Sequence, residues 1–497
     1  MSSDSKYDVV VIGGGLGGLE CGYILSKKGK KVLVLEQCGL IGGCIQSFRR
    51  EGHLFDTGFH YVGGLDEGQM LHRLFKYFGL MELPWVRLDR ECFDQVTIGD
   101  SSYKFVNGYE NFEEELCRAF PSQREGIAKY VKMLKEVGDN IQKSFEPRTA
   151  LDVLENSMFS RSAYGFLKES ISDDRLIDVL SGTSIKMELN REKLPLYTFG
   201  QINSTFVQSA YRLRGGGMQI AETLVASIER FGGKVVKNRK VTGFKAVDGR
   251  VSSVIVNNGE EEYETDIVIS DIHPARTAQM LQESGLVRKI FAKRMTSMEN
   301  TFGVFTVNIA LKPGKLRYRN RNEYIYRKGG IWEYHEKLSD EVEAALVSFA
   351  PPKVGREWSE VVDILIPMKW EKVSKWFGTK IGYRGEDYKK FKEEMAERAI
   401  DFVNEKVEGL RAAVDKYWVS TPLTYTDYTG TVEGSAYGIR KDYSNTMYTI
   451  LTPKTPVENV YLTGQNLNLH GILGTSMTSF FTCAEILGMQ TIVEDLG

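Results

Sequence analysis

The sequence has no apolar run long enough to cross a membrane. A membrane-spanning helix needs about 18 or more consecutive apolar residues, and no stretch of the 497 residues reaches that length. The shorter apolar run from Val9 to Leu19 also differs from an export signal, because Asp4 and Asp8 precede it and glycines interrupt it. We therefore expect a cytoplasmic protein, with a peripheral position on a membrane surface as the alternative.

Neither sign of charge is in clear excess. The chain has 64 Lys and Arg residues against 66 Asp and Glu residues, a formal net charge of -2. Proteins that bind nucleic acid usually carry a positive excess that neutralises phosphates, so we expect no nucleic-acid partner. Basic residues do gather at 286–295 and 312–328, and the first of these segments has apolar residues at helical spacing. Such a surface can contact lipid headgroups, although core packing with a solvated basic face gives the same pattern.

Cysteine and histidine are scarce and scattered. The six cysteines have no regular spacing, so the chain lacks a disulfide framework and fits a reducing compartment. Five residues separate Cys38 from Cys44, one more than in the redox-active pairs of flavin disulfide reductases. The six histidines never fall at the close spacings of metal ligands on one helix or turn, so we expect no metal site.

The chain is long enough for more than one domain. Strand-rich passages lie at 7–36, 234–269 and 460–487, whereas the long segments between them mix helices and strands. We predict a discontinuous first domain of residues 1–80, 212–280 and 451–497, and a second domain, inserted twice, of residues 81–211 and 281–450. No internal repeat or low-complexity tract interrupts this organisation.

A dinucleotide-binding pattern opens the chain. A strand, a helix and a second strand are predicted within residues 7–36, and the first turn reads Gly13-x-Gly15-x-x-Gly18. In such a turn the first glycine makes the tight bend, the second lets a diphosphate approach the backbone, and the third lets helix and sheet pack closely. The helix N-terminus then attracts the phosphates. Glu36 ends the second strand, where an acid accepts hydrogen bonds from ribose hydroxyls and repels a 2′-phosphate.

Two blocks after Glu36 resemble a known family. The glycine pair in Gly42-Gly43-Cys44 and the stretch 55–61 (Phe-Asp-Thr-Gly-Phe-His-Tyr) resemble the FAD-dependent amine-oxidase-like superfamily. Within it they are most similar to the branch of phytoene desaturases, carotenoid isomerases and retinol saturases, and to retinol saturases above all. Three further blocks of the same family pattern lie at 214–218, 266–271 and 460–474.

The resemblance implies FAD as the cofactor. The implied fold class is α/β: a Rossmann-type FAD-binding domain of the amine-oxidase-like kind with an inserted mixed α+β substrate domain. A helix that begins near Gly474 would direct the positive end of its dipole at the flavin. Two positions depart from the family pattern, since Cys44 stands where many relatives have Arg or Lys, and Gln465 where many have an acid. The residues that the resemblance assigns to FAD binding are Gly13, Gly15, Leu16, Gly17, Gly18, Glu36, Gln37, Gly42, Gly43, Cys44, Gly58, Val241, Gly464, Gln465, Gly471, Ile472 and Gly474.

The resemblance also implies candidate proton-transfer residues. His60 and Tyr61 follow the block that would lie near the flavin, where a hydride transfer is paired with a proton transfer. Tyr425 and Asp427 belong to a stretch that resembles the family's segment beside the flavin ring, as does Tyr437. Ordinary hydrogen bonding and packing account for the same residues, so both interpretations stay open.

These features together predict an FAD-dependent oxidoreductase that saturates, desaturates or isomerises carbon–carbon double bonds of a hydrophobic polyene or lipid. Its partners would be that small molecule and an external electron donor or acceptor. The same superfamily contains flavin amine oxidases, which would show an aromatic cage and often a lysine near the flavin. The same architecture also serves lipid carriers of the GDP-dissociation-inhibitor type, which have no need of an intact Gly13, Gly15, Gly18 and Glu36 pattern.

Overall fold

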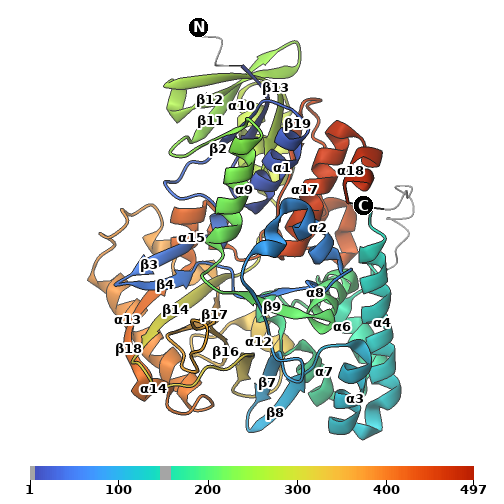
Figure 1. Cartoon of the computed structure of the whole chain (residues 1–497), viewed down its shortest axis with the longest axis vertical. Helices are drawn as coiled ribbons and strands as arrows, with labels where there is room; N and C mark the ends of the chain where they lie inside the picture. The colour runs from blue at the N-terminus through green and yellow to red at the C-terminus, as the bar shows by residue number, and fades with distance from the viewer. Residues whose placement is uncertain (1–5, 146–157, 497) are drawn as a thin grey trace.

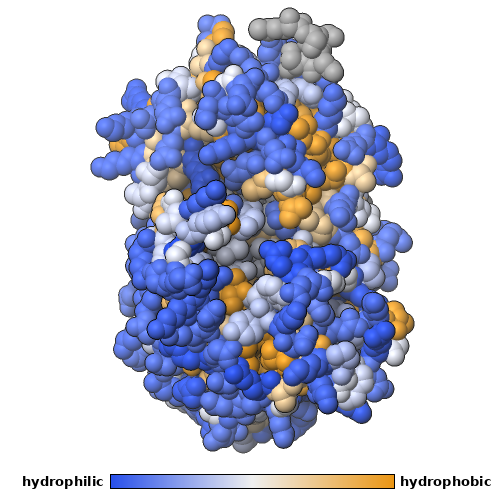
Figure 2. Space-filling view, turned by 90° about the vertical axis from the view of Figure 1, so that its left-hand side faces the viewer, coloured by the Kyte–Doolittle hydropathy of each residue, from blue (hydrophilic) through white to orange (hydrophobic). Residues whose placement is uncertain are grey.

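The computed structural model describes residues 6–145 and 158–496 of the chain. Two large sheets lie toward opposite ends of an elongated molecule, with helices packed against them (Figure 1). The face drawn in Figure 2 is mostly hydrophilic and is hollowed near its middle, where apolar residues come to the surface. None of the helices in the described ranges is both long and apolar enough to cross a membrane.

The first sheet is built around five parallel strands. In spatial order they are β10 Lys234–Val236, β2 Val32–Leu35, β1 Lys6–Ile12, β13 Glu261–Ser270 and β19 Val460–Leu462. A hairpin of β11 Val241–Val247 and β12 Arg250–Val256 adds two antiparallel strands beside the start of β13. Residues 9–12 and 32–35 are all apolar and buried, because both faces of the parallel part are covered.

Helices cover the two faces of this sheet differently. On one face α1 Leu16–Lys27 packs against α17 Gly471–Leu487 and α9 Met218–Arg230. On the other face α10 Pro274–Glu283 packs against β11 and against α11 Lys289–Thr296. Side chains alternate between the faces along β1, so Val9 and Val11 join the first layer, and Val10 joins the second.

The second sheet has seven strands and is mixed. Its order is β18 Val414–Ser420, β14 Gly303–Leu311, β17 Val361–Met368, β16 Ala344–Phe349, β15 Asn322–Tyr326, β7 Asp94–Ile98 and β8 Ser101–Phe105. Only the pair β15 and β7 is parallel among these described strands. The outer face of the sheet packs under α13 Glu386–Asn404 and α14 Leu410–Ala413.

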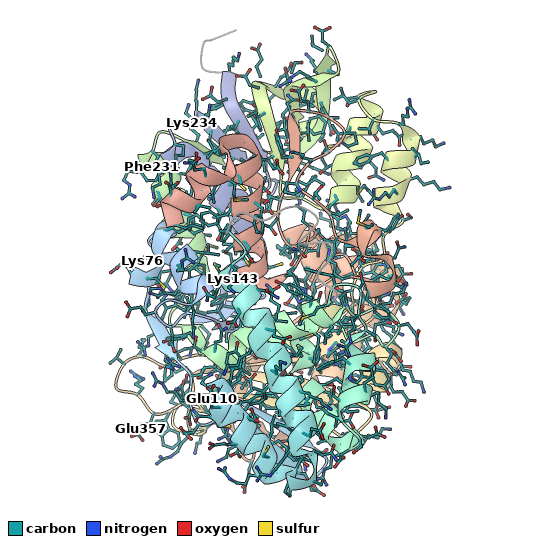
Figure 3. The ribbon with its side chains drawn as sticks, turned by 90° about the vertical axis from the view of Figure 1, so that its right-hand side faces the viewer. Lys76, Glu110, Lys143, Phe231, Lys234 and Glu357 are labelled. Atoms are coloured by element: carbon teal, nitrogen blue, oxygen red, sulfur yellow. The ribbon has the colours of Figure 1, made fainter. Side chains whose placement is uncertain are left out.

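A helical layer covers the side of the molecule that Figure 3 presents. Its longest member is α4 Arg124–Gln142, which packs against α3 Tyr109–Ala119 and against the buried helix α8 Leu196–Gln208. The shorter helices α6 Ala163–Ser170 and α7 Asp174–Ser181 continue this layer. A surface ion pair between Lys135 and Glu110, 2.6 Å long, joins α4 to the start of α3.

A small three-stranded sheet of β5 Val62–Gly63, β9 Ala210–Leu213 and β6 Trp85–Arg87 connects the two large sheets. The first large sheet draws its strands from segments 1–80, 212–280 and 451–497, and the second draws its strands from segments 81–211 and 281–450. The small sheet takes strands from both sets, and the division into two domains stays a prediction. The predicted α/β fold class with a Rossmann-type sheet is confirmed. The helix expected to begin near Gly474 begins three residues earlier, at Gly471.

Candidate cofactor and substrate site

The glycine turn after β1 leaves no room for side chains. Gly13 has a φ of +101°, in the left-handed region that favours glycine. A Cβ at Gly18 would clash with the carbonyl oxygen of Gly13, and a Cβ at Gly14 would clash with the side chain of Ile41. The end of β1 and the first turn of α1 therefore approach each other closely, as a diphosphate-binding turn requires.

The N-terminus of α1 lacks a side-chain cap. Its N-cap residue is Gly15, which has no side chain to accept hydrogen bonds from the first turn. Glu36 is buried at the end of β2, where its carboxylate accepts the N–H of Gly14 at 2.9 Å and the N–H of Cys38 at 2.7 Å. An uncapped helix N-terminus and an acid after the second strand are the features that bind the diphosphate and the ribose of a dinucleotide.

Asp271 follows β13 and contacts the same turn. A Cβ at Gly15 or Gly17 would come within 2.6 Å of its carboxylate oxygens. Burial raises the pKa of Asp271 to about 7, and the nearby Glu36 carboxylate adds to the effect, while a hydrogen bond from the Gly18 N–H opposes it. Asp271 reaches the turn because β13 pairs in parallel with β1, a long-range contact that its sequence neighbours did not reveal.

The loop after β2 folds over the turn. The N–H of Gly42 donates to the carbonyl oxygen of Gly14 at 2.7 Å. The chain returns to this loop at Gly58, where a Cβ would lie 3.1 Å from the carbonyl oxygen of Cys44. Burial raises the pKa of the Cys44 thiol to about 11, so this side chain is neutral at pH 7.

Two more segments meet the same loop. The N–H of Arg239 donates to the carbonyl oxygen of Glu36 at 2.8 Å, which brings the start of β11 at Val241 beside the predicted ribose acid. The end of α15 Pro422–Thr429 approaches from the other side, since a Cβ at Gly430 would come within 2.6 Å of the Gln37 side-chain nitrogen. Both contacts join segments about 200 and 390 residues away in the sequence to the loop 36–44.

The predicted C-terminal flavin segment follows β19. The N–H of Thr463 donates to the carbonyl oxygen of Ser270 at 2.9 Å, which leaves Gly464 against Asp271. Gln465 lies 3.6 Å from the position of a Cβ at Gly438. Gly471 begins α17 and Ile472 packs against the main hydrophobic core, while a Cβ at Gly474 would come 2.5 Å from the carbonyl oxygen of Leu469.

The structure thus brings the predicted FAD-binding residues together at the carboxyl edge of the first sheet. They come from the turn 13–18, the loop 36–44, Gly58, the start of β11 and the segment 464–474. Leu16 is buried in the core at the first turn of α1. Crowded glycines, an uncapped helix N-terminus and Glu36 fit a dinucleotide, and the assignment of each residue to FAD stays a prediction.

A buried polar row crosses the inner face of the second sheet. Its members stand side by side on five neighbouring strands and are Asn308, Asp363, Ser348, Asn322 and Asp94. Each is at most 5% exposed. Asn308 donates to Asp363 at 2.6 Å, and Asn322 donates to Asp94 at 2.7 Å. Polar side chains at these positions are unusual in a buried sheet, because each unpaired group costs about 1–3 kcal/mol.

The predicted residues His60 and Tyr61 lie over this polar row. His60 Nδ1 is 3.9 Å from an Asp363 carboxylate oxygen, and the hydroxyl of Tyr61 donates to Asp94 at 2.9 Å. Burial, with the Arg212 charge nearby, lowers the pKa of His60 to about 4, so its ring is neutral at pH 7. Within the described residues, the buried His60 Nε2 atom has no hydrogen-bond partner.

The other two predicted catalytic residues lie on α15 but face different surroundings. Tyr425 is buried, and its hydroxyl donates to the carbonyl oxygen of Thr57 at 2.7 Å, one residue from Gly58. Asp427 is ion-paired with Arg384. The structure therefore groups Tyr425 with the segment of His60 and Tyr61, and places Asp427 in a separate ion pair.

Three residues of the site escaped sequence reasoning. Lys186, Asp94 and Tyr324 surround the hydroxyl of Tyr61, at 3.4, 2.9 and 2.6 Å. They come from separate parts of the chain, and none has a local motif that marks it. Only the alternation of β7 and β15 held a signal, since it places Asp94 and Tyr324 on the inner face of a strand.

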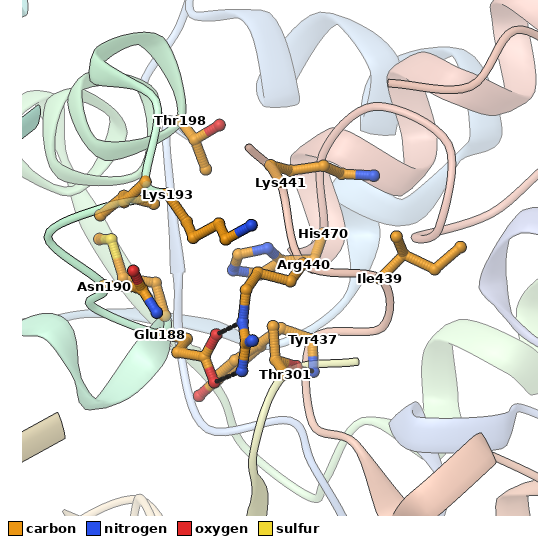
Figure 4. Close-up of a pocket in the computed structure, with 12 residues that line it drawn as sticks. Glu188, Asn190, Lys193, Thr198, Thr301, Tyr437, Ile439, Arg440, Lys441 and His470 are labelled. Atoms are coloured by element: carbon orange, nitrogen blue, oxygen red, sulfur yellow. Dashed lines mark hydrogen bonds and ion pairs between the residues drawn. The ribbon is translucent and has the colours of Figure 1, made fainter. Parts of the chain in front are cut away.

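A small pocket borders the predicted flavin segment at His470 (Figure 4). Tyr437, another predicted residue, stacks on His470 with ring centres 4.6 Å apart, and its hydroxyl donates to the carbonyl oxygen of Ile185 at 2.5 Å. An ion pair between Arg440 and Glu188 crosses the pocket wall. The remaining lining residues are Met187, Asn190, Lys193, Leu194, Thr198, Thr301, Ile439 and Lys441.

Neither metal nor disulfide chemistry is supported by the arrangement. No group of three or more His, Cys, Asp or Glu side chains in residues 6–145 and 158–496 is placed to hold a metal ion. Cys38 and Cys44 are both free thiols. Burial raises the pKa of Cys38 to about 12, which disfavours the reactive thiolate that disulfide exchange requires.

Solved structures of other proteins share the fold of this chain. Residues 11–78 match the family of NAD(P)-binding Rossmann-like domains. An oxidoreductase from Methanosarcina mazei superposes over 98% of this chain and 100% of its own, with a TM-score of 0.63 at 18% identity. Putrescine oxidase with bound putrescine superposes over 97% of this chain and 99% of its own, with a TM-score of 0.64 at 15% identity. The fold is that of the FAD-dependent amine-oxidase-like oxidoreductases.

Sequence comparison then gives the branch. The chain is 27% identical to the all-trans-retinol 13,14-reductase of Danio rerio, over 97% of this chain and 86% of that protein. It is 22% identical to the 4,4'-diapolycopen-4-al dehydrogenase of Metabacillus indicus, over 93% of both chains. The chain is thus similar over most of its length to retinol reductases and a carotenoid dehydrogenase, in line with the resemblance that the motifs in its first 61 residues predicted.

Proposed function

We propose that this protein is an FAD-dependent oxidoreductase that saturates, desaturates or isomerises carbon–carbon double bonds of a hydrophobic polyene. The single observation that carries the proposal is the predicted dinucleotide-binding turn. Gly13, Gly18 and Glu36 have the residue types and close contacts that this turn requires, and they lie beside the uncapped N-terminus of α1. Relatives that match almost the whole chain are named for retinol and for carotenoid aldehydes, and these names supply the substrate class.

The proposal assigns separate tasks to the two predicted domains. The turn 13–18 and the N-terminus of α1 would hold the diphosphate, and Glu36 would accept from the ribose of the adenosine half. Bound FAD supplies hydride transfer to or from a substrate carbon. The inner face of the second sheet, with its aromatic and aliphatic side chains, would orient the polyene and exclude water, and Tyr61 would exchange the accompanying proton.

Anaerobic mixing with candidate substrates tests the proposal. Purified holoprotein is mixed in the oxidised and in the dithionite-reduced state with all-trans-retinol, with a carotenoid and with putrescine, while flavin absorption is followed. We expect retinol or the carotenoid to bleach the oxidised flavin or to restore the reduced one, and putrescine to do neither. Bleaching by putrescine alone would establish an amine oxidase instead. A colourless protein that does not take up added FAD would point to a lipid carrier.

We further propose that α11 contacts a membrane surface, where hydrophobic substrates dissolve. Arg288, Lys289 and Lys293 are exposed on this helix and its N-cap, and Ile290 is 76% exposed between them. Met447 is 71% exposed, and its carbonyl oxygen accepts from Arg294 of α11 at 3.1 Å. Basic side chains around exposed apolar ones suit an anionic lipid surface.

A further inference from the structure

A buried charged cluster surrounds the hydroxyl of Tyr61. Lys186 ends the short helix η4 Ser184–Lys186, and its Nζ lies 3.4 Å from the Tyr61 hydroxyl and 3.9 Å from an Asp94 carboxylate oxygen. The hydroxyl of Tyr324 lies 2.6 Å from that of Tyr61. Asp94 and Tyr324 are fully buried, whereas the side chain of Lys186 is 10% exposed. Lys186 and Tyr61, which is 9% exposed, are therefore the two members of this cluster that keep some exposed surface.

Lys186 lies between two segments that are predicted to contact the flavin. Its side chain meets Tyr61, three residues after Gly58, and its carbonyl oxygen lies 3.3 Å from Nε2 of His470, the residue before α17. Its ammonium group also lies 4.1 Å from the centre of the Phe206 ring. The lysine is thus held by an aromatic face on one side and by hydrogen-bonding groups on the other.

The surroundings make Lys186 titrate near neutral pH. Burial lowers the pKa of Lys186 to about 8, and the Asp94 carboxylate opposes that shift. Burial and the same carboxylate raise the pKa of Tyr61 well above its ordinary value, so the phenol is protonated at pH 7. The titratable and charged groups that face the cluster are Asp94 from β7, Tyr324 from β15, Arg212 from β9 through Asn322, and His470.

We propose that Lys186 is a positioning residue that supplies Tyr61 with the proton that Tyr61 gives to the substrate. This rests on the proposed function. In saturation, bound FAD would supply the hydride for one alkene carbon, and the Tyr61 hydroxyl would give its proton to the other. The Lys186 ammonium group then returns a proton to the Tyr61 oxygen, and solvent reprotonates the lysine. In desaturation the same protons move in the opposite direction, and Asp94 balances the buried charge in both.

Neutral His60 cannot take this place. Its pKa of about 4 leaves it without a second proton at pH 7. Its neighbour Asp363 has a pKa raised to about 7 by burial, but this carboxyl group lies 3.9 Å from His60 and is hydrogen-bonded to Asn308. The cluster at Tyr61 differs in that it places a hydroxyl between a lysine and a carboxylate.

The first test needs no substrate. The visible spectrum of the oxidised holoprotein is followed from pH 6 to pH 10, since an ionisation close to the flavin changes its absorption. We expect one transition near pH 8 in the wild type, loss of that transition in Lys186→Met, and a shift beyond pH 10 in Lys186→Arg. Lys168→Met, a surface lysine paired with Asp174, is the matched control and should titrate like the wild type. A wild type without the transition, or a Lys186→Met protein that keeps it, would overturn the proposal.

The second test uses the reaction itself. Reoxidation of the reduced flavin by all-trans-retinol should slow about tenfold per pH unit above pH 8 in the wild type. Lys186→Met should slow it at least about 100-fold at pH 7 while binding of retinol, followed by tryptophan quenching, stays unchanged. Lys186→Arg should keep the positive charge but react as slowly as Lys186→Met, because a guanidinium group does not give up its proton near neutral pH. If retinol gives no turnover, the proposed substrate fails while the spectral titration still decides the role of Lys186.

Discussion

At the scale of single residues, Asp271 places a carboxylate beside the turn that is predicted to bind a negatively charged diphosphate. Its carboxylate lies against Gly15 and Gly17, at the positive end of α1, with Glu36 as a second acid nearby. A dinucleotide brings two more negative charges to this place. The protonation state of Asp271 therefore bears directly on how well a flavin cofactor is retained.

Replacement of Asp271 by asparagine should change the pH dependence of flavin retention. A carboxyl group with a pKa of about 7 is neutral below that pH and charged above it. Retention of FAD by the wild type should therefore weaken as the pH rises from 6 to 9, and Asp271→Asn should retain FAD about tenfold more tightly at pH 9, equivalent to about 1.4 kcal/mol. Fluorescence of released FAD measures this. Asp266→Asn, on the exposed part of the same strand, is the control, and parallel curves for Asp271→Asn and wild type would refute the prediction.

At the scale of elements, the contact between α1 and α17 holds the two ends of the chain together. Glu20 of α1 is fully buried, and it accepts from Ser476 at 2.6 Å and from Ser479 at 2.9 Å of α17. Burial raises the pKa of Glu20 to about 8, although both serine hydroxyls oppose the shift. The folded protein therefore keeps a neutral carboxyl group in this helix contact at pH 7.

The raised pKa makes this contact weaker at alkaline pH. Between pH 4.5 and 8 the unfolded chain releases the Glu20 proton while the folded protein keeps it, so stability falls with rising pH. Glu20→Gln has a side chain of the same shape that stays neutral at every pH. The melting temperature of this variant should therefore exceed that of the wild type by an amount that grows from pH 5 to pH 8. The difference in unfolding free energy should reach a few kcal/mol, at about 1.4 kcal/mol per pKa unit. A constant difference across this pH range would show that Glu20 does not titrate in this way.

The turn between β1 and α1 allows a second test at the scale of elements. Gly18→Ala would place a Cβ against the carbonyl oxygen of Gly13, so the turn must open. We expect loss of flavin retention by at least about tenfold and destabilisation of about 2 kcal/mol or more. Gly243→Ala on β11 is the control, because its Cβ would lie at an ordinary 3.7 Å from Ile255. Flavin content after purification and circular dichroism measure both effects, and normal flavin content in Gly18→Ala would contradict the expected crowding.

At the scale of the whole molecule, the site lies between two sheets and the proposed lipid contact lies outside both. The first sheet presents its carboxyl edge, and the second presents its inner face with the polar row. A polyene substrate must leave a membrane or a carrier before it reaches this interior. We assign the uptake of the substrate from the membrane to the basic surface of α11.

Charge reversal on α11 tests this assignment. The double variant Lys289→Glu/Lys293→Glu should sediment with phosphatidylserine-containing vesicles at least about tenfold less than the wild type, since each lysine contributes about 1 kcal/mol near an anionic surface. Added salt should weaken wild-type binding in the same way. Lys129→Glu/Lys132→Glu on α4 is the matched control, because both lysines are exposed far along the chain from α11. Equal loss in both double variants, or no wild-type binding, would reject a specific lipid contact.

The amino-acid sequence by itself determined the features that depend on neighbours in the chain. Gly13, Gly15, Gly18 and Glu36 lie within 24 residues, so local steric and capping rules were enough to predict the strand, turn and helix that they form. The family pattern added the prediction that Tyr61 lies near the flavin. Only the tertiary structure decided what surrounds Tyr61. Asp94 and Lys186 are 33 and 125 residues away from it, and they meet because sheet register and the packing of η4 bring them together, which no local rule specifies.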